Sequence, residues 1–278
     1  MCKDGDCSGA PMAEQLTEDG LRRCRRDGLE LAYSVIGEGS PVLFVHGATA
    51  TGRFEWSALA DTLASRHRCI LPDLRGHGRS AFPGSGMTGA EICADLRHLI
   101  DELELERPHL VGFSYGSEIA LMLELSAPGT ARSLVQLSPG TGRPSDYRAP
   151  RLDHLYESWP FVLRNLHEVQ HGSDHWRRLV TALHEDSLGR QEFSMAALAA
   201  IDCPILLLAG ARDEATRRKQ GKRFAAANSR ARYVEIDGAA HAVHHECPQR
   251  VGQLIGDFLA FVDDDATRTE CHGTAESS

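Results

Sequence analysis

The sequence contains no hydrophobic run long enough to cross a membrane. A helix that spans a bilayer needs roughly 20 predominantly apolar residues, and no stretch of this chain approaches that length. The N-terminal residues Met1–Cys7 hold no apolar segment of the kind that a secretory signal peptide requires. We therefore expect a cytoplasmic protein that does not act at a membrane.

The sequence also lacks an excess of basic residues. It has 30 lysines and arginines against 39 aspartates and glutamates, which gives a formal net charge of −9. A nucleic-acid backbone is densely negative and is bound mainly through Lys and Arg side chains. Nucleic acid is therefore not an expected partner.

Cysteine pairs of the C-x-x-C type are absent, although the chain has eight cysteines. Without a secretion signal a disulfide framework is not expected. Cys2 and Cys7 are close in sequence, but the four-ligand spacings of a zinc site are missing. Cys69 and Cys203 adjoin apolar strand-like runs, where a thiol behaves as a small hydrophobic side chain. The sequence thus predicts no metal and no cofactor.

What the chain does contain is an alternation of strand-like and helix-like segments over most of its 278 residues. This length suits one substantial core. The alternation predicts an α/β fold in which a doubly wound, mostly parallel sheet has helices on both faces. A hairpin around Asp27-Gly28 is expected at one edge. The core is predicted to comprise residues 21–138 and 201–262.

The alternation stops between residues 139 and 200. This segment has the composition of several helices without strands, and we interpret it as a helical cap on the main domain. Residues 1–20 and 263–278 are polar and are expected to form flexible segments at the two ends of the chain.

The most informative motif is Gly112-Phe113-Ser114-Tyr115-Gly116, which reads G-x-S-x-G. An apolar strand-like run precedes it and a helix-like run follows it, which is the context that a nucleophile elbow requires. Glycines flanking the serine allow the strand and helix to approach closely. A helix that starts here also directs unpaired N–H groups toward a developing oxyanion. This pattern predicts Ser114 as a nucleophile.

Four motifs taken together resemble the α/β-hydrolase family, in particular its compact, cap-bearing bacterial serine hydrolases. In chain order these are His46-Gly47, the run Asp73–Ser80, the elbow, and His241 followed by Glu246 and Pro248. The resemblance covers about residues 27–262. It implies an eight-stranded sheet with the cap inserted after the sixth strand.

The resemblance also implies a catalytic triad, because a serine hydroxyl needs a base and the base needs an orienting acid. In this fold the chain order is Ser, acid, His. Asp213 follows the strand that ends at Gly210, where the family carries its acid, and Asp237 is the alternative. His241 follows a loop of small residues and matches the family's base.

The resemblance further implies an oxyanion hole made by the backbone N–H groups of Ala48 and Tyr115. The run Asp73–Ser80 resembles a structural signature of the family, so we expect its polar side chains to be scaffolding. Glu118 departs from the family, which usually has a small residue there. It is interpreted as a salt-bridge partner of a neighbouring helix, with a role beside the site as the alternative.

Three histidines with a four-residue spacing, His167, His171 and His175, could gather on one helix face and hold a metal. Gly172 interrupts that helix, and no carboxylate or cysteine completes a ligand set. We therefore interpret the three as solvated histidines of the cap. His244 and His245, close to His241, are interpreted as helix-entry or cap-contact residues.

The expected function is a serine hydrolase that forms an acyl-enzyme on Ser114 with an ester, thioester, lactone or ketone. Three cap aromatics, Trp159, Phe161 and Trp176, suggest a small to medium apolar substrate. A lyase or acyltransferase that tailors natural products, and a ligand-binding protein without catalysis, remain alternatives on the same fold. The partner is a small molecule; the oligomeric state, including a homodimer, is left open.

Overall fold

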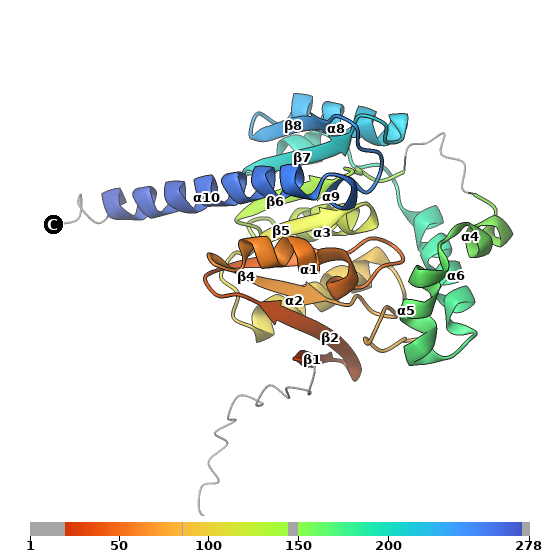
Figure 1. Ribbon diagram of the computed structural model, residues 1–278. Coiled ribbons are helices and arrows are strands. Elements are labelled where there is room, and N and C mark those ends of the chain that lie inside the picture. Colours follow the sequence, from red (N-terminus) through yellow and green to blue (C-terminus); the bar gives the residue numbers. More distant parts are fainter. Residues whose placement is uncertain (1–19, 85, 144–149, 274–278) are drawn as a thin grey trace, which may run out of the picture.

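An eight-stranded sheet forms the centre of the molecule (Figure 1). The computed structural model describes residues 20–84, 86–143 and 150–273. The strand order across the sheet is β1-β2-β4-β3-β5-β6-β7-β8. The strands are β1 Leu21–Arg26, β2 Leu29–Ile36, β3 Ser40–Val45, β4 His67–Pro72, β5 His109–Phe113, β6 Ser133–Leu137, β7 Ile205–Gly210 and β8 Ala231–Ile236.

The sheet is antiparallel only at one edge. β1 pairs antiparallel with β2, and β2 with β4, whereas all the other pairings are parallel. β1 and β2 are joined by Asp27 and Gly28, which have φ of 50° and 82°. An Asp-Gly pair is favoured in such a tight hairpin because both central residues need positive φ. The predicted α/β fold class, with a mostly parallel eight-stranded sheet, is confirmed.

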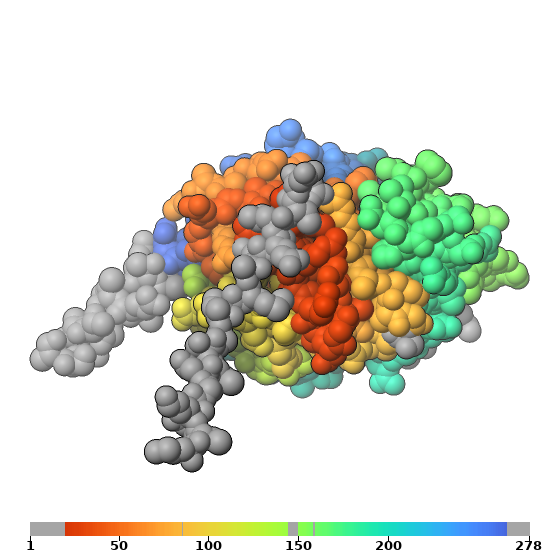
Figure 2. All heavy atoms as spheres, turned by 90° about the horizontal axis from the view of Figure 1, so that it is seen from below, coloured from red at the N-terminus to blue at the C-terminus, as the bar shows by residue number. Residues whose placement is uncertain are grey.

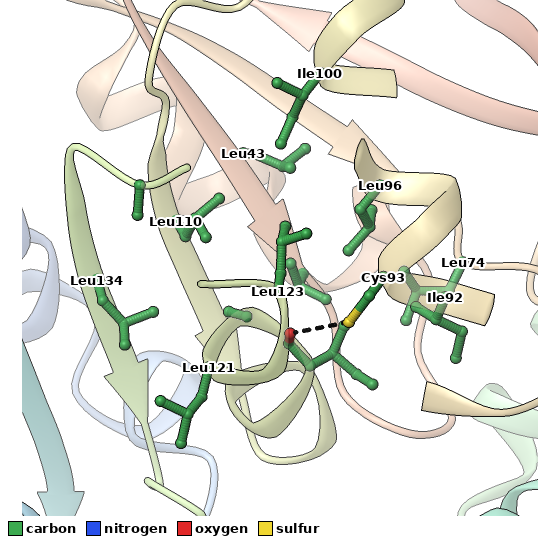
Figure 3. Close-up of a cluster of buried hydrophobic side chains, with 14 of the residues drawn as sticks. Leu43, Leu74, Ile92, Cys93, Leu96, Ile100, Leu110, Leu121, Leu123 and Leu134 are labelled. Atoms are coloured by element: carbon green, nitrogen blue, oxygen red, sulfur yellow. Dashed lines mark hydrogen bonds between the residues drawn. The ribbon is translucent and has the colours of Figure 1, made fainter. Parts of the chain in front are cut away.

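Helices cover both faces of this sheet. Helices α1, α9 and α10 pack on one face through side chains such as Trp56, Val243 and Leu259. Helices α2, α3 and α8 pack on the other, where Figure 3 shows Leu96 and Leu123 beside strand residues such as Leu110. These helices are α1 Gly52–Leu63, α2 Gly89–Glu102, α3 Tyr115–Ser126, α8 Ala215–Ala227, α9 Val243–Glu246 and α10 Pro248–Gly273. None of the helices in the described part of the chain is long and apolar enough to span a membrane.

Four further helices lie between β6 and β7 along the chain. They are α4 Leu152–Ser158, α5 Phe161–His171, α6 His175–Gly189 and α7 Met195–Ala199. Helices α4, α5 and α6, which we call the cap helices, stand together at one side of the sheet (Figure 1). In Figure 2 the green atoms of these helices lie against the orange atoms of the core loops. Residues 144–149 of the predicted cap lie outside the described residues.

The C-terminal helix is longer than predicted. The core was expected to end at Val262, but α10 continues to Gly273. Flexibility over residues 263–278 stays a prediction. Asp263 is one reason for the longer helix, because its carboxylate accepts hydrogen bonds from His109 at 3.0 Å and Arg132 at 2.9 Å. These contacts tie the helix to the sheet beyond its predicted end. Residues 274–278, and residues 1–19 of the predicted N-terminal segment, lie outside the described residues.

The elbow needs glycine at positions 112 and 116 because its backbone there lies very close to other backbone atoms. A Cβ at Gly116 would overlap the carbonyl oxygens of Val45, the last residue of strand β3, and of His46, which follows it. A Cβ at Gly112 would overlap the backbone of Gly116 itself. Only residues without a side chain fit there, and this close packing fixes the position of Ser114 between β5 and α3.

Candidate active site

Ser114 sits at the sharp turn between β5 and α3. Its backbone has φ 54° and ψ −111°, a region that L-amino acids other than glycine rarely adopt. Such strain persists only where the surrounding packing enforces it, and it is concentrated at functional sites. The turn directs the Ser114 side chain into a hollow on the surface instead of into the core.

Ser114, His241 and Asp213 form a hydrogen-bonded series across the loops that follow β5, β8 and β7. The Ser114 hydroxyl lies 3.0 Å from Nε2 of His241. On the other side of the ring, Nδ1 of His241 lies 3.0 Å from Oδ1 of Asp213. In this arrangement Asp213 accepts a hydrogen bond from Nδ1–H of His241, which leaves Nε2 free to accept one from the Ser114 hydroxyl. Asp237, the alternative acid, is exposed. Within the described part of the chain, the carboxylate that contacts Nδ1 of His241 is that of Asp213.

Asp213 is buried, yet it is held ionised. Burial opposes the charged form, but the hydrogen bond and charge of His241 outweigh it and lower the pKa of Asp213. The backbone N–H of Glu214 donates a further hydrogen bond to Oδ1 at 2.7 Å. Ser138 supports His241, because the Ser138 hydroxyl donates a hydrogen bond to the backbone carbonyl oxygen of His241.

The two predicted oxyanion donors border the same hollow as Ser114. Tyr115 is the first residue of α3, so its N–H has no acceptor within the helix. Ala48 lies on the loop after β3, where Nε2 of His77 lies 2.8 Å from the Ala48 carbonyl oxygen. His46 accepts from the Leu74 N–H at 3.0 Å through Nε2 and donates to the Gly47 carbonyl through Nδ1 at 2.7 Å. The loop is therefore held by histidine hydrogen bonds on both sides.

The run after β4 has the scaffolding role that we expected from its sequence. Asp73 accepts hydrogen bonds from the Gly52 N–H at 2.8 Å and the Arg79 N–H at 2.9 Å. Arg75 pairs with Asp95 of α2 in a bidentate contact of 2.5 and 2.7 Å. These buried contacts connect the loop after β4 to α1 and α2 rather than to the hollow beside Ser114.

The hollow at Ser114 has a volume of about 280 Å³. Its apolar wall comes from the cap helices and the segments joining them, through Leu155, Trp159, Val180 and Leu183. The other two predicted aromatics do not line it: Phe161 is 76% exposed on the outside of α5, and Trp176 is buried inside the cap. A larger hollow of about 720 Å³, between α5 and the loops after β3 and β4, does not include Ser114 or His241.

Charged side chains occupy the rest of the wall of the Ser114 hollow. Glu118 is buried and pairs with Arg190 of the cap at 2.6 Å. Arg190 also contacts Asp186, and Arg217 donates to the Ser138 carbonyl at 3.0 Å. Glu118 therefore has both features that the sequence suggested: it forms a salt bridge to the cap, and it lines the hollow beside Ser114. The sequence alone did not indicate that arginines would gather here.

The three cap histidines are not solvated, and that prediction is wrong. His167 is buried, donates from Nε2 to the Thr49 carbonyl at 2.9 Å and accepts from the Gly78 N–H at 3.0 Å. His171 and His175 lie 2.9 and 2.7 Å from the carbonyls of Gly78 and Gly76. Their partners are backbone groups of the core loops. They attach the cap helices to the loops that border the active site.

Glu55 was missed by the sequence analysis. It is buried in α1, and its Oε1 accepts from Nε2 of His244 at 2.8 Å and from Nε2 of His245 at 2.7 Å. Its Oε2 accepts from the Gly47 N–H at 3.3 Å. Nothing in the local sequence marks Glu55, because its partners are 189 and 190 positions away along the chain.

Residues 42–254 match the family model described as "Alpha/beta hydrolase family". The chain belongs to the alpha/beta hydrolase family. The matched residues include most of β3, every strand from β4 to β8 and all three members of the hydrogen-bonded series.

Individual relatives support the fold and the general type of enzyme. The chain is 30% identical to Protein PHYLLO, chloroplastic, of Arabidopsis thaliana over 84% of its own length, but this spans only 16% of that protein. It is 34% identical to a 2-hydroxy-6-oxo-2,4-heptadienoate hydrolase of Pseudomonas putida over 39% of this chain and 40% of that one. The solved enol-lactonase of Burkholderia xenovorans has the same fold, with a TM-score of 0.72 at 22% identity, over 86% of this chain and 99% of that one.

The buried cap histidine His167 makes the stability of the protein sensitive to acid. Burial lowers its pKa to about 3, against about 6.5 in an unfolded chain. The unfolded state therefore binds more protons between these values, so this stability is complete above pH 6.5 and is lost as the pH falls toward 3. From pH 7 to pH 5, His167 alone should reduce the free energy of unfolding by about 2 kcal/mol.

The measurement is urea unfolding of wild type and His167→Gln, followed by the fluorescence of Trp176, whose ring stacks on His167. The variant should lose less stability than wild type between pH 7 and pH 5. The exposed His154 of α4 provides the control, and His154→Gln should follow wild type. Parallel pH profiles for wild type and His167→Gln would refute the prediction.

Proposed function

We propose that this protein is a serine hydrolase that cleaves an acyl bond through an acyl-enzyme on Ser114. The observation that carries the proposal is the hydrogen-bonded series from Ser114 through His241 to Asp213, with both spacings at 3.0 Å. A serine hydroxyl is a weak nucleophile at neutral pH, and an adjacent oriented imidazole is what activates it. Membership of the alpha/beta hydrolase family supports the same reaction type.

In the proposed reaction, Ser114 Oγ attacks the acyl carbon as its proton passes to Nε2 of His241. The Asp213 carboxylate stabilises the imidazolium that forms. The N–H groups of Ala48 and Tyr115 donate to the developing oxyanion. The bond to the leaving group then breaks, and the leaving group takes the proton from His241. A water molecule attacks the acyl-enzyme with the same proton relay, which releases the acid and restores the Ser114 hydroxyl.

The hollow supports a small to medium substrate that combines an apolar part with an acidic group. Its apolar wall, formed by Leu155, Trp159, Val180 and Leu183, suits a hydrocarbon portion. Arginines bind carboxylates well because the guanidinium group can donate two parallel hydrogen bonds. Three arginines line the hollow, and the contacts of Arg217 among the described residues are a backbone carbonyl at 3.0 Å and a carboxylate 3.9 Å away. Arg217 is therefore the best placed to receive an acidic group.

The roles of the three side chains can be tested by steady-state hydrolysis of a chain-length series of p-nitrophenyl esters. Ser114→Ala and Asp213→Asn should each lower kcat by at least about 1,000-fold, as the loss of a triad member does in serine hydrolases. Asp237→Asn removes the exposed alternative acid and is the matched control, with kcat expected within about twofold of wild type. Near-normal turnover by folded Ser114→Ala, or a large loss in Asp237→Asn, would contradict the assignment.

The preference for an acidic group can be tested with paired esters that differ only in a terminal carboxylate. Arg217→Gln should lower kcat/KM for the carboxylate-bearing ester by about 10- to 100-fold, because a charge-assisted hydrogen bond is lost. Turnover of the neutral ester should change little. Arg223→Gln, on the same helix but outside the hollow, should affect neither ester. Equal losses on both esters in Arg217→Gln would show that Arg217 supports the fold instead.

A further inference from the structure

The contacts of Glu55 bring one carboxylate oxygen and two imidazole nitrogens to one point. Nε2 of His244 and Nε2 of His245 lie 2.8 and 2.7 Å from the same oxygen, Oε1 of Glu55. These three atoms all lie within 4.8 Å of one another. They come from α1 and α9, two elements far apart in sequence that pack together on one face of the sheet. The cluster is separate from the hydrogen-bonded series of Ser114, His241 and Asp213.

The chemical state of the cluster suits a metal ion. Burial opposes ionisation of Glu55, but hydrogen bonds from His244 and His245 lower its pKa to about 2, so it is a carboxylate at neutral pH. Burial lowers the pKa of His244, so this imidazole is neutral. A metal ion binds carboxylates and unprotonated imidazole nitrogens, so a hydrogen on Nε2 of either ring would have to leave or move to Nδ1 when an ion binds.

We propose that Glu55, His244 and His245 form a binding site for a divalent cation of the zinc type. Two imidazoles and one carboxylate are a ligand set that Zn²⁺ and Co²⁺ accept, with a fourth position left for water. Ca²⁺ and Mg²⁺ prefer oxygen ligands and fit poorly. Access comes from the side of His245, whose side chain is 45% exposed, whereas those of Glu55 and His244 are 4% and 3% exposed.

A second cluster, His67, His109 and Asp263, also has two imidazoles and one carboxylate but a different electrostatic environment. The guanidinium of Arg132 lies 2.9 Å from Oδ1 of Asp263, the oxygen that also contacts His109. A fixed positive charge at that distance repels a cation. Among the described residues, the Glu55 carboxylate instead accepts hydrogen bonds from two histidines and the Gly47 N–H. For this reason the site is assigned to Glu55 and not to Asp263.

The proposed site is connected to both sides of the active site. His244 lies three residues after His241 along the chain, and Glu55 Oε2 accepts a hydrogen bond from the Gly47 N–H just before the oxyanion residue Ala48. An ion that draws the two imidazoles to about 2.1 Å from itself would shift α9 and the His241 loop. Occupancy should therefore lower ester hydrolysis, an effect that rests on the proposed function, whereas binding itself does not.

The direct test is a titration of the chelator-treated full-length protein with Co²⁺, whose visible absorption reports its ligands. One equivalent should produce the spectrum of a tetrahedral or five-coordinate site and should be displaced by Zn²⁺. Trp56 stacks on His244 with ring centroids 4.9 Å apart, so its emission should be quenched in parallel. A wild-type protein that gives neither signal would overturn the proposal.

Two variants test the ligands, and two others serve as controls. His245→Ala removes the exposed ligand and should weaken Co²⁺ binding at least tenfold, and Glu55→Gln should do the same. His154→Ala, on the exposed face of α4, should bind as wild type does. His241→Gln removes another nearby imidazole and should also retain binding. If Glu55→Gln does not fold, His245→Ala decides the question, because wild-type affinity in folded His245→Ala would exclude the site. Hydrolysis is measured separately, so failure of the proposed reaction leaves the binding result intact.

Discussion

The hydrogen-bonded series from Ser114 through His241 to Asp213 is the interaction on which the site depends. Its members lie 28 and 127 positions apart along the chain, so only the fold can bring them together. The parallel strands do this, because their carboxyl ends lie along one edge of the sheet and each loop that leaves that edge supplies one residue. The close approach of Gly116 to the end of strand β3 then fixes the position at which the Ser114 hydroxyl meets the imidazole.

Neutral buried histidines connect this edge to the rest of the protein. His46 and His77 brace the loop that carries Ala48, and His167 attaches the cap to the same loop. A neutral imidazole can donate at one nitrogen and accept at the other, so one side chain can satisfy two backbone groups that a loop leaves unpaired. The loops around the site are thereby fixed without regular secondary structure, at the cost of stability in acid.

The sequence predicted the sheet, the elbow and the three members of the series because each has a local signal. Strand and helix composition alternate along the chain, G-x-S-x-G marks Ser114, and Asp213 and His241 each follow a recognisable strand. The cap histidines were predicted to be solvated, but they contact backbone groups of the core loops. Spacing reports which residues share a helix face, whereas burial depends on what that face meets.

Contacts between distant residues explain the other differences. The pairs Glu118–Arg190 and Glu55–His244 join segments that are 72 and 189 positions apart, and no pattern in either segment refers to the other. The C-terminal helix extends beyond its predicted end, and Asp263 there pairs with His109 of β5 and with Arg132, which precedes β6. Aromatic composition likewise could not distinguish Trp159, which borders the hollow, from Trp176, which packs the inside of the cap.

The central claim is that the fold turns the Ser114 hydroxyl into a nucleophile. The most direct measurement is intact and peptide mass spectrometry after treatment with a fluorophosphonate, a reagent that reacts with activated serines. We expect a single fluorophosphonate adduct, located on Ser114, in the native protein and no adduct after unfolding in urea. A native, folded protein that stays unlabelled at Ser114, or that is labelled equally when unfolded, would contradict it.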